Sequence, residues 1–177
     1  MDSADYVTAE QEKARYLEHN NDVNDPGYQQ FVAPIVGAVT ENHSPEDLGL
    51  DYGSGTGPVI TKLLNDRNYN IVTYDPIFNK KQGALNRTYD YIVSCEVIEH
   101  FHDPAEEFEG LRRILKPGGK LYIMTYLFTE DIDFPSWNYK DDQTHVIIYH
   151  PKAIEWIKNH FGFEKVTIDD RLILFQG

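Results

Sequence analysis

The chain has one cysteine, Cys95, no long apolar run and few basic residues. A single thiol cannot form a disulfide within the chain, and a cysteine-rich zinc site is excluded as well. No apolar stretch approaches the roughly 20 residues that a membrane-spanning helix needs. The first 21 residues are acidic and polar, which is wrong for a secretory signal. We therefore expect a cytoplasmic protein without a membrane span.

The shortage of basic residues leaves a formal net charge of −13, from 29 acidic and 16 basic side chains. Such a surface repels phosphate backbones, and no cluster of lysines or arginines offsets it locally. Tight binding to long nucleic acid is therefore not expected, and a small neutral or cationic substrate fits better. The 177 residues suit one compact domain, as a monomer or homodimer.

Helical and strand-like segments alternate along the chain. Helical spacing predicts helices over residues 4–18, 26–40, 58–68, 103–115 and 151–161. Runs rich in β-branched and aromatic residues predict strands over 48–53, 69–75, 89–97 and 120–128, and a strand pair over 164–177. The "KPGG" at 116–119 is expected to break the chain. This order predicts an α/β fold, a Rossmann-like doubly wound sheet, mostly parallel with an antiparallel C-terminal edge strand.

Polar and glycine-rich segments follow three of these strands. In doubly wound sheets, ligands bind beyond the carboxyl ends of the strands, where the strand order reverses. Residues 51–57, Asp75 and residues 95–100 all fall at strand ends of that kind. We expect these three segments to meet at one edge of the sheet.

The glycine turn after the first strand has an informative spacing. Gly53, Gly55 and Gly57 form G-x-G-x-G, with Asp51 two residues ahead and Pro58 behind. Nicotinamide-binding turns are instead written G-x-G-x-x-G. The spacing here resembles the first motif of the class I S-adenosylmethionine-dependent methyltransferases. The resemblance extends to Asp75 and to the block running from "EVIEH" to "LKPGG" at 96–119.

This resemblance implies a binding site for S-adenosyl-L-methionine. In the family, the acid that ends the second strand binds the ribose hydroxyls, which assigns that role to Asp75, and Asp51 orders the turn and reaches the methionine amino group. The residues implied to line the cofactor site are Asp51, Tyr52, Gly53, Gly55, Gly57, Asp75, Pro76, Cys95 and Glu96. The alternative interpretations are an ordinary tight turn for the glycines, a helix cap or loop acid for Asp75, and a small buried apolar residue for Cys95.

The chain departs from the family pattern after Asp75. Only residues 76–88 separate it from the next predicted strand, whereas the family usually fits a helix and a third strand there. We therefore predict a sheet shortened around the third strand. Without the acid that normally follows that strand, adenine is expected to rest on backbone and apolar side chains such as Ile77 and Phe78.

The "EVIEH" segment also suggests a metal site. Glu96, Glu99 and His100 can share one helix face, and His145 follows 45 residues later. This pattern is similar to the divalent-metal site of the ubiquinone-pathway O-methyltransferases and of the enzymes that 2′-O-methylate small-RNA ends. It implies Glu96, Glu99, His100 and His145 as ligands of Mg²⁺, Mn²⁺ or Zn²⁺. One alternative places Glu96 beside the cofactor and His100 in the pocket wall without metal, and another makes His100 or His145 a general base.

The N-terminal segment and one long loop are candidates for shaping the substrate pocket. The resemblance implies that residues 1–45 form a helical cap over the cofactor and that 46–177 form the core of one compact domain. The cap residues that could contact methionine or the acceptor are Tyr16, His19, Asn20 and Tyr28. Phe134, Trp137 and Tyr139 are candidates for the acceptor wall. The alternative in both places is ordinary capping and packing.

We accordingly predict a methyltransferase that acts on a small acceptor, most readily at oxygen, with Glu96, His100 and His145 as catalytic candidates. One rival is a regulatory relative that holds the cofactor without turnover. A second is an RNA-end 2′-O-methyltransferase, which conflicts with the charge. A third is a nicotinamide oxidoreductase, which conflicts with the glycine spacing.

Overall fold

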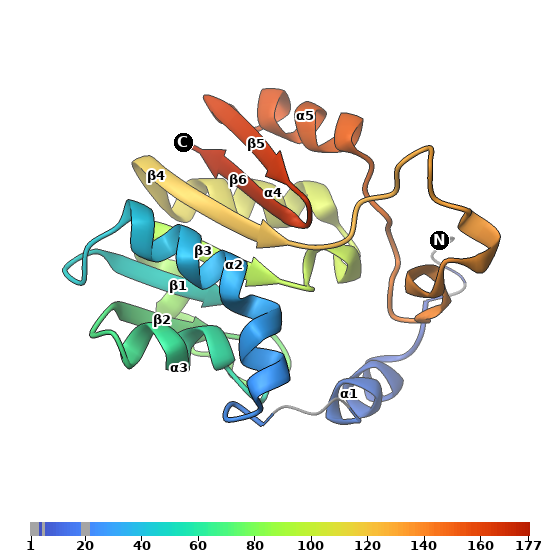
Figure 1. The fold of residues 1–177 in the computed structure, drawn as a ribbon, viewed down its shortest axis with the longest axis horizontal. Coiled ribbons are helices and arrows are strands. Elements are labelled where there is room, and N and C mark those ends of the chain that lie inside the picture. The colour runs from blue at the N-terminus through green and yellow to red at the C-terminus, as the bar shows by residue number, and fades with distance from the viewer. Residues whose placement is uncertain (1–3, 5, 19–21) are drawn as a thin grey trace.

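A computed structural model describes residues 4, 6–18 and 22–177. Its centre is a six-stranded sheet with the order β2-β1-β3-β4-β6-β5 (Figure 1). The strands are β1 (Leu48–Tyr52), β2 (Asn70–Tyr74), β3 (Tyr89–Cys95), β4 (Leu115–Met124), β5 (Lys165–Asp169) and β6 (Leu172–Gln176). The first four run parallel, and β6 pairs antiparallel with both β4 and β5. The predicted fold class is confirmed.

Helices cover both faces of the sheet, as Figure 1 shows. The helices that cover it are α2 (Pro26–Asn42), α3 (Val59–Asn65), α4 (Pro104–Ile114) and α5 (Pro151–His160), and α1 (Ala9–Leu17) lies apart from the sheet. One hydrophobic layer joins α2 and α3 to the sheet through residues such as Ile35 and Tyr91. The opposite layer joins α4 and α5 to it through residues such as Phe108 and Ile92. Tyr91 and Ile92 are neighbours in β3, so the alternation of a strand feeds both layers.

Two predicted boundaries differ from the structure. The helix expected from residue 4 begins at Ala9, because Thr8 and Gln11 form a capping box there. The "KPGG" segment does not interrupt the chain before a strand at 120. Instead β4 already pairs with β3 at Leu115, and the register then jumps so that Lys120 faces Tyr91. The glycines are absorbed as an irregularity within one strand, where Gly118 has φ 74°.

The expected shortening of the sheet is present. Between β2 and β3, the described residues form an isolated bridge between Asp75 and Asn79 and a short 3₁₀ helix, Gln82–Asn86, and no strand. β2 is consequently the outer strand on that side of the sheet. Within the described ranges, none of the helices is both long and apolar enough to cross a membrane.

The parallel strands end at one edge, which we call the carboxyl rim. Tyr52 faces Tyr74 across β1 and β2, and Cys95 faces Met124 across β3 and β4. The strand order reverses between β1 and β3, because β2 lies on the other side of β1. Figure 1 shows α1 and the loop of residues 125–150 beyond this rim. α1 has no buried residue, whereas α2 packs against the sheet. The predicted division at residue 45 stays a prediction.

Candidate active site

The glycine turn at the end of β1 needs residues without a side chain. Gly53 and Gly55 have φ values of 78° and 59°, in the left-handed region that other residues rarely adopt. A Cβ on Gly53 would lie 2.5 Å from Cγ2 of Val97. The amides of Gly53 and Ser54 donate to the carbonyl of Tyr74, at 2.9 and 3.1 Å. The end of β2 therefore holds the turn in place.

Asp75 directly follows β2 at the carboxyl rim. Its carboxylate is buried, and Oδ2 accepts a hydrogen bond from the amide of Gly55 at 2.9 Å. Oδ1 accepts from the amides of Ile77 and Phe78, each at 2.8 Å. The same side chain thus closes the turn after β2 and fixes the glycine turn after β1. Exposed Pro76 follows it directly at the rim.

Asp51 is buried and directly precedes Tyr52 in β1. Its Oδ2 accepts a hydrogen bond from the hydroxyl of Thr61 in α3 at 2.7 Å. Burial raises the pKa of Asp51 to about 6, although the bond to Thr61 opposes the change. The carboxylate therefore anchors α3 to β1 directly below the glycine turn.

Tyr52 and Cys95 differ in where their side chains lie. Tyr52 points into the opposite hydrophobic layer, where its ring stacks on Tyr74 at 5.3 Å and its hydroxyl donates to Glu107 of α4. The structure does not bring this side chain to the glycine turn. Cys95 ends β3 at the rim, and burial raises the pKa of its thiol well above the ordinary value. That shift suits a small packed residue rather than a nucleophile.

Glu96 follows β3 in a strained conformation, with φ 52°. Its Oε1 lies 3.8 Å from Nη1 of Arg171, which belongs to the turn between β5 and β6. The Arg171 guanidinium lies over the rings of Phe31 and Tyr126, at 4.2 and 5.0 Å from their centroids. Burial, reinforced by the nearby Glu99, raises the pKa of Glu96 to about 8. Sequence reasoning missed Arg171, although it is the one basic residue after Lys165.

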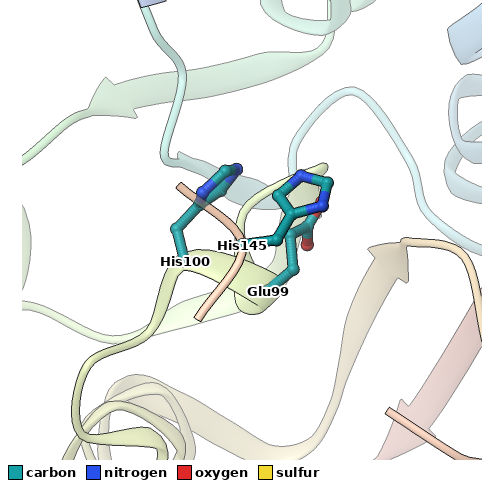
Figure 2. A group of neighbouring side chains, drawn as sticks. All are labelled: Glu99, His100 and His145. Carbon is teal, nitrogen blue, oxygen red and sulfur yellow. The ribbon is translucent and has the colours of Figure 1, made fainter. Parts of the chain in front are cut away.

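Glu99, His100 and His145 come together from two distant segments. One ligand atom from each lies within 4.8 Å of the others, and Figure 2 shows the three side chains grouped beside the rim. We call this group the Glu99 cluster. The short 3₁₀ helix Ile98–His100 carries two of its members. The amides of Val146 and Ile147 donate to the carbonyl of Glu99, which holds the His145 segment against that helix.

The histidines are oriented by backbone carbonyls. Nδ1 of His100 lies 2.8 Å from the carbonyl of Thr144, and Nδ1 of His145 lies 2.7 Å from that of Tyr139. A carbonyl only accepts, so both Nδ1 atoms carry hydrogen, and in a neutral ring the lone pair is on Nε2. Burial and the neighbouring His100 lower the pKa of His145, which favours its neutral form. Both rings are arranged as metal-binding histidines usually are.

The acid of the cluster is fully buried. Oε1 of Glu99 accepts from the hydroxyl of Tyr139 at 2.7 Å, and Oε2 accepts from that of Thr125 at 3.1 Å. These neutral donors do not cancel its charge, and burial raises the pKa of Glu99 above its usual range. Glu96, also expected as a ligand, lies beside this group and outside it. Its carboxylate faces Arg171 instead.

The structure describes two of the four expected cap residues, Tyr16 and Tyr28. Tyr16 of α1 packs edge-on against His100, with ring centroids 5.3 Å apart, and more distantly against Phe78 at 6.5 Å. Burial, with Cys95 and Asp51 nearby, raises the pKa of Tyr28 to about 12. His19 and Asn20 lie outside the described residues.

A large pocket opens between α1 and the loop beyond β4. Its volume is about 1090 Å³, and His145, Tyr139 and Trp137 line one side of it. Arg15 and Glu18 of the N-terminal segment line the other side. Arg15 Nη2 donates to Asp142 at 2.9 Å, which ties the two walls together. Of the three aromatic residues expected in the acceptor wall, Trp137 and Tyr139 line this pocket, and exposed Phe134 contacts the ring of Trp137.

Comparison with solved structures shows the same fold in other proteins. An O-methyltransferase family protein from Burkholderia thailandensis matches with a TM-score of 0.64 and 13% identity, over 94% of this chain and 62% of its own. A methyltransferase from Archaeoglobus fulgidus matches with a TM-score of 0.63 and 15% identity, over 84% and 94%. Human N-acetylserotonin methyltransferase, solved with S-adenosylmethionine, matches with a TM-score of 0.60 and 14% identity, over 84% and 53%. The chain thus spans about three fifths of the first of these proteins and just over half of the last.

These identities are low, so the structural likeness shows the fold alone. Among curated protein sequences, none matches the chain significantly. A family model described as a methyltransferase domain matches residues 24–168, which is most of the chain. That range holds the glycine turn, Asp75 and the Glu99 cluster. The chain therefore belongs to the methyltransferase domain family, the S-adenosylmethionine-dependent transferases of one-carbon groups.

Proposed function

We propose that this protein transfers a methyl group from S-adenosyl-L-methionine to an oxygen of a small acceptor, assisted by a divalent cation at the Glu99 cluster. The proposal follows the resemblance to the ubiquinone-pathway O-methyltransferases. The observation that carries it is the position of the Glu99 cluster. It lies beside the carboxyl rim and its His145 also lines the large pocket.

The residues at the rim fit the cofactor. The turn at Gly53 and Gly55 exposes backbone without side chains, next to two buried acids, Asp51 and Asp75. Asp51 offers negative charge to an ammonium group, and the Asp75 oxygens that hold the turn still have lone pairs for ribose hydroxyls. Ile77 and Phe78 follow Asp75 as apolar surface for adenine. S-adenosylmethionine supplies an electrophilic methyl group on a sulfonium.

The Glu99 cluster fits a divalent cation. It offers one carboxylate and two imidazoles whose Nδ1 atoms are held by carbonyls. A buried acid paired only to hydroxyls is better accommodated with a cation nearby. A bound cation would lower the pKa of an acceptor hydroxyl and stabilise the oxyanion. The role of the chain is to hold the acceptor oxygen in line with the methyl group, between His145 and the rim.

The large pocket supports an enzyme rather than a regulatory protein that binds the cofactor without reaction. A regulatory relative would need no space beside the cluster, whereas here about 1090 Å³ opens next to His145. Pockets that bind small molecules commonly have such volumes, up to about 1,000 Å³.

Cofactor identity is tested by thermal unfolding with S-adenosylhomocysteine and with NAD. S-adenosylhomocysteine at 100 times its Kd should stabilise the fold by about 2.7 kcal/mol, and NAD should not. Stabilisation by NAD alone would overturn the assignment.

The cation is tested by calorimetric titration of Mn²⁺ into the protein and its variants. Glu99→Gln combined with His145→Ala should abolish Mn²⁺ binding while S-adenosylhomocysteine still binds. His160→Ala, which removes an exposed histidine of α5, is the matched control and should bind Mn²⁺ normally. Unchanged Mn²⁺ binding in the double variant would remove the cation from the proposal.

A further inference from the structure

The pocket beside the Glu99 cluster has a chemical character that selects among acceptors. Tyr139 and His145 form its reactive end, because Tyr139 donates to Glu99 and His145 belongs to the cluster. The pocket continues past Trp137 and Tyr126 to α1. An acceptor that fills the pocket therefore has one end at the Glu99 cluster and the other end near Trp137 and α1.

The loop wall of the pocket is aromatic. The Tyr139 ring lies 5.2 Å from that of Trp137 and 5.1 Å from that of Tyr126, measured between centroids. Faces of such rings attract cations, and tryptophan does so most strongly. Tyr126 already holds one, because the Arg171 guanidinium lies over its ring at 5.0 Å. The wall is built of groups that bind positive charge.

The charged residues around the pocket also favour a cationic ligand. Residues 126–145 contain five acids and one lysine. Among the residues that line the pocket, Glu18, Asp141 and Asp142 are acidic and Arg15 is basic. Arg15 pairs with Asp142 and Glu18, and Lys140 pairs with Asp141. One carboxylate remains in excess after this pairing, in a chain of net charge −13. The excess carboxylate would repel an anionic ligand in this pocket and would attract a cationic one.

We infer that the acceptor is a cationic amine, bound with its ammonium group against the Trp137 wall and its methylated atom at His145. This inference rests on the proposed function and adds the substrate class. An ammonium group gains from both the ring faces and the acidic lining, whereas a neutral group gains little and a carboxylate is repelled.

The two tryptophans of the chain allow a direct test. Trp137 lines the pocket and Trp156 lies exposed on α5, so Trp156→Phe leaves Trp137 as the sole reporter. The probes are tyramine, tyrosol and 4-hydroxyphenylacetate, which share a phenol ring and differ in the charge at the other end. In fluorescence titration with S-adenosylhomocysteine present, tyramine should bind at least tenfold more tightly than 4-hydroxyphenylacetate, with tyrosol between them. Equal affinities, or tighter binding of the carboxylate, would overturn the inference.

Matched variants separate local charge from total charge. Glu18→Gln combined with Asp141→Asn should reduce the preference for tyramine at least threefold. Glu46→Gln combined with Glu109→Gln removes the same charge from exposed sites outside the pocket and should leave the preference intact. An equal loss of preference in both pairs of variants would contradict a local site.

S-adenosylhomocysteine binding is measured by calorimetry on the same samples. If it fails, the proposed function fails, and if it persists without discrimination among probes, only the acceptor class is wrong.

Discussion

The carboxylate of Asp75 accepts a hydrogen bond from the amide of Gly55 at 2.9 Å. The acid at the end of β2 therefore fixes the glycine turn at the end of β1, and the two halves of the proposed cofactor site support each other. In the proposed site, Asp75 would combine this structural role with binding of the ribose.

Asp75→Ala should consequently lower both stability and cofactor affinity. Three amides, those of Gly55, Ile77 and Phe78, lose their acceptor, and we expect a loss of roughly 1–3 kcal/mol in the free energy of unfolding. Urea denaturation measures this loss, and calorimetry should show S-adenosylhomocysteine binding at least about tenfold weaker, or 1.4 kcal/mol. Asp66→Ala, at an exposed ion pair with Lys62, should change neither quantity appreciably. Undiminished affinity in Asp75→Ala would remove the ribose role.

Gly53→Ala should be among the most damaging single-methyl changes in the chain. The added Cβ meets Val97 at 2.5 Å, and φ of 78° disfavours any side chain. We expect a loss of roughly 2–4 kcal/mol, with weakened S-adenosylhomocysteine binding. Gly37→Ala is the comparison, because nothing lies within 4 Å of its added Cβ in α2, and it should stabilise the protein by about 0.5–1 kcal/mol. Similar stability in the two variants would contradict the described turn.

Asp51→Asn should stabilise the unliganded protein at neutral pH. The pKa of Asp51 is about 6 when folded, above its ordinary 3.8, so ionisation in the folded state costs free energy. Stability should fall as pH rises from about 4 to about 6, and the variant should lack that part of the fall. At pH 7 we expect a gain of roughly 1–3 kcal/mol, because Thr61 can still donate to the amide oxygen. Melting temperatures measured from pH 4 to pH 7 check this, and a variant less stable than the parent at pH 7 would refute it.

The same variant should bind S-adenosylhomocysteine less tightly. The loss follows if the Asp51 carboxylate faces the ammonium group of the cofactor. In the parent protein, affinity should then decrease below about pH 6, as Asp51 becomes protonated. Isothermal titration at pH 5 and pH 7 measures this, with the variant expected to show a flatter dependence.

Arg171→Gln should destabilise the rim more than Arg171→Lys. The glutamine removes the charge opposite Glu96 and the contacts with Phe31 and Tyr126, whereas lysine keeps the charge and loses the planar stacking. A loss of about 1–2 kcal/mol is expected for glutamine, with partial recovery for lysine. Arg113→Gln on the exposed side of α4 controls for the loss of one arginine. Equal effects at positions 113 and 171 would show that these contacts contribute nothing.

The sequence was sufficient to predict the sheet and the meeting of its strand ends, because these follow from local periodicity and from the geometry of parallel strands. The grouping of Glu99, His100 and His145 was also expected, through the family resemblance. Tyr52 stays a prediction for the cofactor site, and its side chain points to the face opposite that of Asp51, as the alternation of neighbouring strand residues would indicate. The partners Thr61 and Arg171 were not predictable, because they depend on contacts between segments distant in the chain.

The order of the last two strands limits how the rim can form during folding. β6 follows β5 in the chain but lies between β5 and β4, so β5 can join the sheet only through β6. Arg171, in the turn between them, therefore reaches Glu96 through a segment that is synthesised after β1 to β4. β1 and β2 can pair before that segment is made, so the rim acquires the Arg171 contact with Glu96 only after its first strands have formed.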